Sequence, residues 1–472
     1  MRAHLASGTE LAHEAGIVKR KAYGSVLNWT NLVLIALGSA LFALYRRGIH
    51  GLQSDYQGVE YIVWFIKLAL IQSALYVAAA WVVWRAVASR PTLMIVVIFA
   101  ALFRMSLLFA PPVLSDDLYR YIWDGRVQAA GINPYRYIPA DEALAGLRDE
   151  AIYNKINRRD NAHTIYPPVA QLFYFLVTRV SESVTWMKIA MVGCEAVALF
   201  ALMSLLAAFG WPRVRVLIFA WHPLLVWEIA GSGHVDALMI VLILLALLAR
   251  RNQNQTLAGI ALAAATLVKF FPVVLLPALY RRWSWKMPAA FIATICLAYA
   301  PYLSVGAKAA LGFLPDYAGQ EGIESGERFF LLALARRVTA DGVPNAAYLT
   351  VAVGIMAFIA AWALCQAQSS EAGYLRWSCL LATAFTVLLA PHYAWYFAWL
   401  VPFMCFAPAV SLFYLTGVSW VLYATWLGDA PGQLFTINAA LYVPFLMLGT
   451  LSLALRYANR LKSPTPARTA ES

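Results

Sequence analysis

Apolar runs separated by short polar turns fill most of the chain. Runs of about 17 to 24 residues recur, and each is long enough to cross a hydrocarbon core of roughly 30 Å as a helix. The pattern therefore predicts an all-α fold, a polytopic transmembrane helical bundle of about twelve spans with additional interfacial or re-entrant helices. The predicted spans lie near residues 27–45, 61–84, 92–113, 186–208, 215–229, 235–248, 287–303, 347–366, 375–390, 394–408, 411–428 and 437–455.

Two other apolar segments do not have the pattern of ordinary spans. Residues 166–177 are apolar over only about ten positions, so we expect an interfacial or re-entrant helix there. Residues 256–280 are interrupted by Lys269 and two prolines, and basic residues follow them. We expect a broken hairpin that enters and leaves on one side. Because non-helical backbone at membrane depth needs protein or water around it, the break at Lys269 should line a cavity.

The polar segments define the predicted domain organisation. Residues 114–165 hold eight of the 24 acidic residues together with many tyrosines, which favours a folded outer loop resting on the lipid headgroups. Residues 304–346 form a second outer loop. Both ends of the chain, 1–26 and 456–472, carry basic residues, and such tails stay in the cytoplasm. We therefore predict one transmembrane catalytic domain, 27–455, between two cytoplasmic tails.

Composition supports this interpretation and excludes other classes of protein. Of 472 residues, 62% are hydrophobic and 13% charged, and the mean hydropathy is +0.66; a soluble protein of this length would lack polar cover. The net charge of +12 reports topology, since no soluble basic face exists to bind nucleic acid. The five cysteines lie in apolar runs without CxxC spacing, so we expect buried, inert thiols.

An acid pair, Asp116 and Asp117, directly follows the apolar run 92–113. Neighbouring acids at the edge of a hydrophobic slab repel each other and lose hydration, so at least one pKa should rise. That suits a general base working near neutral pH. The pair also fits a helix start, with Ser115 as N-cap and acids in the first turn, and both interpretations stay open. In such a helix Asp116, Arg120 and Asp124 share one face, and Gly125 and Gly131 end it.

Further ionisable groups fall on the same outer side or inside apolar runs, where they usually face functional cavities. His234 and Asp236 fit either a metal pair or a polar turn, and two ligands are too few to assign a metal. Lys269 fits either an anionic ligand, such as a phosphate, or a structural ion pair. Arg104 has three possible roles: it faces a functional cavity, it snorkels outward, or it pairs with an acid for structural reasons. The outer groups are Asp116, Asp117, Asp124, Glu228, His234, Asp236, Arg328 and His392.

The stretch around the acid pair resembles the first-outer-loop motif of bacterial GT-C glycosyltransferases, and most closely the polyprenyl-phosphomannose-dependent α-mannosyltransferases. The motif is Ser115-Asp-Asp-Leu-Tyr-Arg-Tyr-Ile-Trp-Asp-Gly-Arg-Val-Gln-Ala-Ala-Gly-Ile-Asn-Pro-Tyr135. Shorter segments resemble that family's later signatures in the right order: Tyr166-Pro-Pro168, His222-Pro-Leu-Leu225, Gly233-His-Val-Asp-Ala237, Leu267-Val-Lys-Phe-Phe-Pro272 and Pro391-His-Tyr-Ala-Trp-Tyr396. The resemblance covers about residues 92–410. The acidic loop follows the third span here, rather than the first, so the two leading spans look like an addition.

The resemblance implies a GT-C-like enzyme of the bacterial inner membrane, with its active site facing the periplasm or exterior. It would move a hexose, mannose by this likeness, from a polyprenyl-phosphate donor to a hydroxyl of a glycan or glycolipid acceptor, with inversion. Asp116 would be the general base, and Asp117 its neighbour or substitute. The resemblance implies no required cofactor, and a divalent metal is compatible with it. The predicted substrate-binding residues are Arg120, Asp124, Arg126, Tyr135, Glu228, His234, Asp236, Lys269, Arg328 and His392; Lys269 and Arg328 are the candidates for the donor phosphate.

Two other classes fit the sequence less well. A transporter or lipid flippase would hold its charges near the bilayer midplane and often show internal repeats, whereas this chain has its charges in outer loops and no evident repeat. A membrane acyltransferase would need an HxxxD-type pair or a nucleophile, and the sequence offers neither.

Overall fold

The computed structural model describes residues 28–53, 59–86, 89–112, 114–312, 319, 322–339, 342–428, 430 and 432–462. The predicted tail at 1–26 lies outside these ranges, as do parts of the second outer loop. Within them the chain is helical and contains no strand. The α-helices are α2 (Trp29–Gln53), α3 (Val59–Arg85), α4 (Arg90–Leu108), α5 (Asp117–Ala129), α6 (Pro168–Thr178), α7 (Val184–Ala208), α8 (Leu217–Ala220), α9 (Pro223–Leu225), α10 (Asp236–Arg251), α11 (Gln255–Thr266), α12 (Leu276–Leu279), α13 (Lys286–Tyr299), α15 (Phe330–Val338), α16 (Asn345–Gln366), α17 (Gly373–Leu389), α18 (Val401–Met404), α19 (Val410–Val418) and α20 (Gln433–Lys462).

Tighter or wider helical turns connect these elements. One of them, η4 (Val226–Gly231), is a π-helix. The others are the 3-10 helices η1 (Glu142–Leu147), η2 (Tyr153–Lys155), η3 (Arg213–Val216), η5 (Phe271–Leu275), η6 (Ala300–Val305), η7 (Ala309–Leu311), η8 (Ala394–Leu400) and η9 (Ser419–Leu427).

Eight helices in the described part of the chain are long and apolar enough to cross a membrane. The helix pair Arg213–Ala220 and Pro223–Gly231, which is bent by 56°, is either a broken ninth span or a re-entrant loop. The remaining predicted spans are helical but shorter: α10, α17 and the segment Ala394–Met404. The eight are Trp29–Gly51, Val59–Arg85, Arg90–Leu108, Val184–Ala208, Lys286–Val305, Asn345–Gln366, Val410–Leu427 and Gln433–Asn459. The chain is a polytopic helical membrane protein, as its sequence predicts.

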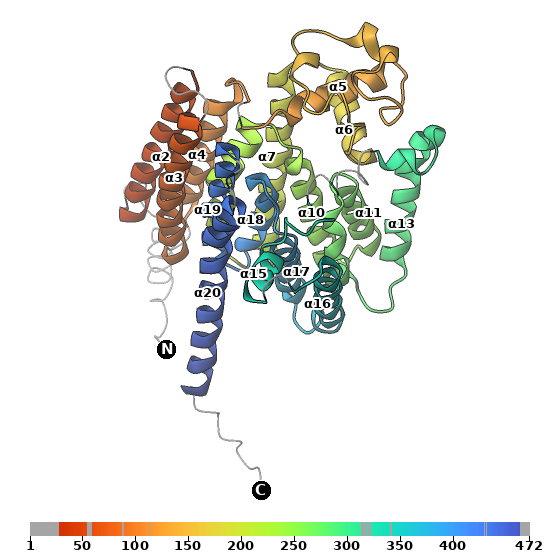
Figure 1. Cartoon of the computed structure of the whole chain (residues 1–472). Helices are drawn as coiled ribbons and strands as arrows, with labels where there is room; N and C mark the ends of the chain where they lie inside the picture. Colours follow the sequence, from red (N-terminus) through yellow and green to blue (C-terminus); the bar gives the residue numbers. More distant parts are fainter. Residues whose placement is uncertain are drawn as a thin grey trace, which may run out of the picture.

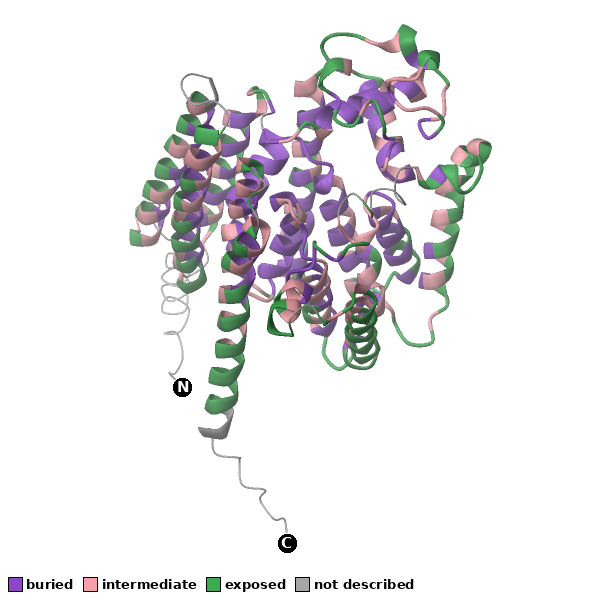
Figure 2. Cartoon of the chain, in the orientation of Figure 1, coloured by how far each residue is buried: buried purple, intermediate pink, exposed green. Residues whose placement is uncertain are grey.

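The outer helices expose apolar side chains that only hydrocarbon can cover. Only 6% of the apolar window of α16, and 17% of that of α20, is buried inside the protein. Val353 and Phe358 of α16 and Leu453 of α20 point outward, and both helices are mostly exposed in Figure 2. In water such surfaces would aggregate, so lipid must surround these helices.

The bundle consists of a three-helix group and a row of helices beside it. Helices α2, α3 and α4 pack together, and α7, α10, α11 and α13 follow one another in contact (Figure 1). Helices α5 and α6 lie at the end of the molecule opposite to the C-terminal end of α20 (Figure 1). α20 continues through Arg456 to Lys462, so the tail expected from 456 begins as helix; its residues 463–472 lie outside the described part.

The predicted break at Lys269 is present. α11 ends at Thr266, and the chain turns before η5 and α12 lead back. Arg281, which follows α12, donates to the Gln253 side chain just before α11, at 3.0 Å between nitrogen and oxygen. Both ends of the segment therefore lie at the same end of the bundle, as expected for a hairpin. α6, with 11 residues, spans only about 16 Å and is too short to cross the bilayer.

Two details of the helix after the acid pair differ from prediction. Gly125 does not end α5, which continues to Ala129. A Cβ at Gly125 would lie 2.5 Å from the Thr178 hydroxyl oxygen, so glycine serves the close packing of α5 on α6. Asp116 occupies the N-cap position, one residue later than predicted, but the side-chain hydrogen bond at the helix start still comes from Ser115, whose Oγ accepts from the amide of Asp117 at 3.2 Å.

Candidate active site

Asp116 occupies the N-cap position of α5, yet its carboxylate makes no capping hydrogen bond. The residue is exposed. Nearby protein atoms desolvate the carboxylate in part and Asp117 adds a negative charge; both raise the pKa of Asp116, while Lys155 lowers it. The capping role therefore does not occupy this side chain, and its position suits proton transfer.

Asp117 faces inward from the first turn of α5. Its Oδ1 accepts from Asn157 Nδ2 at 3.0 Å, and its Oδ2 lies 3.8 Å from His234 Nδ1. The side chain retains 25% exposure, whereas His234 is buried. The two adjacent acids thus differ: Asp116 is open, and Asp117 is held by neighbouring side chains.

The turn after η4 brings His234 beneath α5. Gly233 has φ of +76°, and a Cβ there would lie 2.1 Å from Leu118 Cδ1. Only glycine allows both this backbone conformation and this approach. The amide of His234 donates to the Glu228 carbonyl at 3.0 Å, which fixes the turn against the π-helix.

Glu228 lies inside the π-helix, and its carboxylate faces His234 from the other side. Tyr423 donates to Glu228 Oε1 at 2.6 Å, and Glu228 Oε2 lies 3.4 Å from His234 Nε2. The imidazole is therefore placed between two carboxylates. It also stacks on Trp395, with ring centroids 4.4 Å apart. Widened π turns are frequent at functional sites.

Lys269 forms an ion pair with Asp236, at 2.6 Å between Nζ and Oδ2. Its ammonium also lies 4.8 Å from the ring centroid of Tyr396. The structure thus shows the ion-pair alternative for Lys269, at the predicted helix break. Asp236 Oδ1 is buried and has no hydrogen-bond partner in the described residues, so this pair retains one acceptor.

Asp117, Glu228, His234, Asp236 and Lys269 form a cluster of ionisable side chains, and the turn at 390–393 leads to it. Arg328 Nε donates to the Leu389 carbonyl at 3.2 Å, and burial together with the charge of Arg328 lowers the pKa of His392 to about 4. The next residue, Tyr393, stacks on Trp395 at 4.5 Å, which in turn stacks on His234. His392 is therefore linked to His234 through the rings of Tyr393 and Trp395, and Arg328 lies near His392.

Four predicted substrate-binding residues have partners in the outer loop, in α6 or just after α6. Asp124 accepts from Arg120 at 2.8 Å, as the i, i+4 spacing predicts, and from Thr164 and Gln171. Arg126 binds Glu182 and Asp149, each at 2.8 Å, and Tyr135 donates to the Tyr166 carbonyl at 2.7 Å. These contacts hold α5 to the loop and to α6. A buried pair without further partners would be costly, and these contacts satisfy the polar groups of Arg120 and Asp124.

Several contacts were not predicted. Tyr423 binds Glu228 through its hydroxyl, and Trp395 stacks on His234. Trp395 lies in the 391–396 motif, whereas no local sequence pattern indicates Tyr423. Arg104 pairs with Glu195 of α7, with 3.0 Å between Nε and Oε2, which is the structural-pair alternative. Lys188 of α7 donates to the Leu107 and Ala110 carbonyls at the end of α4, at 2.8 and 2.7 Å.

No group of three His, Cys, Asp or Glu side chains in the described ranges has the arrangement of a metal site.

Comparison with known proteins identifies the family. Residues 27–285 match the family model of the alpha-(1->6)-mannopyranosyltransferase N-terminal domain. No curated protein and no solved structure matches the chain. The matched range contains Asp116, Asp117, Glu228, His234 and the Asp236–Lys269 pair. The chain therefore belongs to the alpha-(1->6)-mannopyranosyltransferase family and is a GT-C-type membrane mannosyltransferase.

Proposed function

We propose that this mannosyltransferase uses a polyprenyl-phosphate-linked mannose as donor and transfers the sugar, with inversion, to an acceptor hydroxyl on the outer face of a bacterial inner membrane. Asp116 is the general base. The observation that carries this proposal is the uncapped, exposed carboxylate of Asp116 beside a cluster of ionisable groups drawn from α5, η4, α10 and the Lys269 break. The basic residues near the opposite end of the bundle support a periplasmic orientation for this cluster.

The proposed transfer is a single displacement. The acceptor oxygen bonds to C1 of mannose as its proton passes to Asp116, and the bond from C1 to the phosphate oxygen breaks. The lipid phosphate leaves with the negative charge. One base suffices, unlike the carboxylate pair of a glycosidase. Inversion to an α product requires a β-linked donor, and the family description implies a 6-hydroxyl as acceptor.

Asp116 is the better base because of its surroundings. Asp117 already accepts from Asn157 and lies beside His234, so its carboxylate is less available to an incoming hydroxyl. Its negative charge instead raises the proton affinity of Asp116. Lys269 and Arg328 are the proposed cations for the leaving phosphate, acting as point charge and planar donor respectively.

Replacing the base tests the proposal. Asp116→Asn should lower transfer from radiolabelled polyprenyl-phosphate mannose by about 10²- to 10⁴-fold, while the purified protein remains folded and monodisperse. Asp160→Asn is the matched control, since Asp160 is an exposed acid of the same outer loop, and should keep normal turnover. Unchanged transfer by the Asp116 variant would overturn the assignment of the base.

A further inference from the structure

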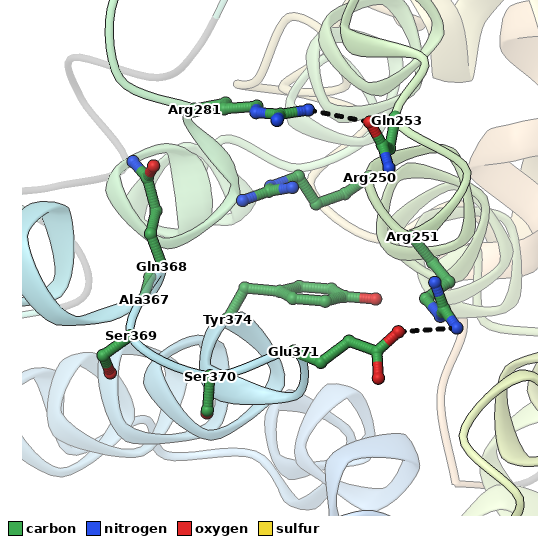
Figure 3. A pocket seen from close by; sticks show the side chains of 10 residues that line it. All are labelled: Arg250, Arg251, Gln253, Arg281, Ala367, Gln368, Ser369, Ser370, Glu371 and Tyr374. Atoms are coloured by element: carbon green, nitrogen blue, oxygen red, sulfur yellow. Dashed lines mark hydrogen bonds and ion pairs between the residues drawn. The ribbon is translucent and has the colours of Figure 1, made fainter.

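A second site lies at the other end of the bundle. A cavity of about 380 Å³ is lined by Arg250, Arg251, Gln253, Arg281, Ala367, Gln368, Ser369, Ser370, Glu371 and Tyr374 (Figure 3). Arg250 and Asp236 stand near opposite ends of α10, roughly 20 Å apart at 1.5 Å per residue. We call this cavity the Arg250 pocket; it is separate from the cluster around Asp117.

Aromatic rings and hydrogen bonds hold the three arginines of the pocket in place. Arg250 lies over the ring of Tyr374 at 5.4 Å and Arg251 over that of Phe209 at 5.0 Å. Arg281 donates to Gln253 at 3.0 Å (Figure 3). Guanidinium groups positioned in this way lose little freedom when a ligand binds.

Positive charge in the pocket exceeds the negative charge that balances it. Among the described residues, Glu371 is the one acid that lines it, and it pairs with Arg251 at 2.8 Å. Arg281 lies close enough to repel the charge of Arg250. The Nε atom of Arg250 is buried and has no hydrogen-bond partner in the described part of the chain. An unsatisfied buried donor is costly, and an anion in the pocket would satisfy it and reduce the repulsion.

The rest of the lining suits a phosphate group at a membrane surface. Gln368 and Ser370 add exposed polar side chains, and the volume is within the usual range for small-ligand pockets. An adjoining cavity of about 640 Å³ shares Gln253 and Arg281 and includes Trp283 and Trp285, which are 95% and 74% exposed. Exposed tryptophans next to membrane helices favour the headgroup layer.

We propose that the Arg250 pocket binds a phosphate-bearing anion, with Arg250 and Arg281 as the principal ligands, and that the headgroup of an anionic phospholipid supplies this phosphate. Arg251 is shared with Glu371 and contributes less. The site is independent of mannose transfer, so the protein should bind this anion without donor or acceptor.

Native mass spectrometry of the full-length protein tests the site. Wild type should retain phosphatidylglycerol in preference to phosphatidylcholine, and Arg250→Gln/Arg281→Gln should bind phosphatidylglycerol at least about tenfold more weakly, as expected for lost charge-assisted hydrogen bonds. Arg213→Gln is the matched control, because Arg213 is an exposed arginine of η3 that does not line the pocket, and should bind as wild type does.

Inorganic phosphate distinguishes the two sources of the ligand. If wild type binds inorganic phosphate but retains no lipid, the anion site stands and its ligand is soluble. If the double variant binds both probes as tightly as wild type does, the proposal is wrong. Should the variant fail to fold, arginine modification by phenylglyoxal in wild type decides: phosphatidylglycerol must protect Arg250 and Arg281 but not Arg213, and unprotected modification overturns the site.

Discussion

Asp116 and Asp117 are neighbours in sequence, but the fold gives their carboxylates different surroundings. Asp116 is open to solvent, while Asp117 is bonded to Asn157 and lies beside His234. The motif predicted that the pair matters, and local physics predicted a raised pKa for one of the two acids. Residues 153–157 of the outer loop fold back over α5, and Asn157 there binds Asp117 rather than Asp116. No local sequence pattern predicts this contact, so the sequence could not show which of the two acids is exposed.

The charges around Asp116 predict opposite pH shifts for two variants. The base must be deprotonated to work, so activity falls as the pH drops through the pKa of Asp116. Asp117→Asn removes the charge that raises this pKa, so the acidic limb of kcat/KM should move to lower pH. Lys155→Gln removes the charge that lowers it, so the limb should move to higher pH. Lys155→Arg keeps the charge and serves as control; limbs that coincide in all variants would contradict Asp116 as the titrating base.

At the scale of elements, the site depends on two helix irregularities that differ in predictability. The break near Lys269 was predicted, because a lysine and two prolines interrupt an apolar run. The π-helix η4 was not, since its extra residue depends on partners distant in sequence, namely Tyr423 and the helix α5 above the turn. Asp124 and Arg126 belong to the motif, and the sequence alone did not predict that they pair with Gln171 of α6 and with Glu182 beyond it.

The contact between α5 and the 231–235 turn predicts a specific loss in Gly233→Ala. The new Cβ would collide with Leu118, and the positive φ adds strain, so unfolding free energy should fall by about 1–3 kcal/mol and transfer should drop as His234 moves from Asp117. Leu118→Ala in the same chain should restore part of the stability. Gly354→Ala is the control, because a Cβ at this position on α16 meets no neighbouring atom, and it should lower neither the unfolding free energy nor the transfer activity. A loss like that of Gly233→Ala would show that any glycine-to-alanine change destabilises the protein. Thermal unfolding and turnover in detergent measure both effects.

The Lys269–Asp236 pair predicts coupled energetics. Lys269→Ala leaves a buried carboxylate without its cation, so the protein should lose about 3–5 kcal/mol of stability, and the donor KM should rise more than the acceptor KM. The double variant Lys269→Ala/Asp236→Ala should be destabilised by less than the sum of the single changes. Additive losses would argue against the pair, and an unchanged donor KM would argue against a contact of Lys269 with the donor phosphate.

At the scale of the whole molecule, hydropathy predicted a polytopic membrane bundle correctly, and the predicted spans are all helical in the described part of the chain. Among the described residues, eight helices have spanning length, or nine with the bent pair, and the other three predicted spans are shorter helices. Apolar content reports burial in lipid or in protein alike, so α10, buried between α7 and α11, has the composition of a span without its length. Helix α5 and the C-terminal end of α20 lie at opposite ends of the bundle (Figure 1), and the positions of the basic residues predict opposite sides of the membrane for them.

The cohesion of the bundle predicts a strong dependence on one buried pair. Arg104 of α4 binds Glu195 of α7 and also donates to the Ala220 carbonyl of α8, so it connects the group α2–α4 to the helices that carry Glu228 and His234. Arg104→Met or Glu195→Leu alone leaves one unpaired charge in a low-dielectric interior and should cost about 3–5 kcal/mol, whereas the double variant removes both charges and should cost less than either. Thermal unfolding of the three variants in detergent measures this. If the double variant is the least stable of the three, charge compensation does not explain the contribution of this pair.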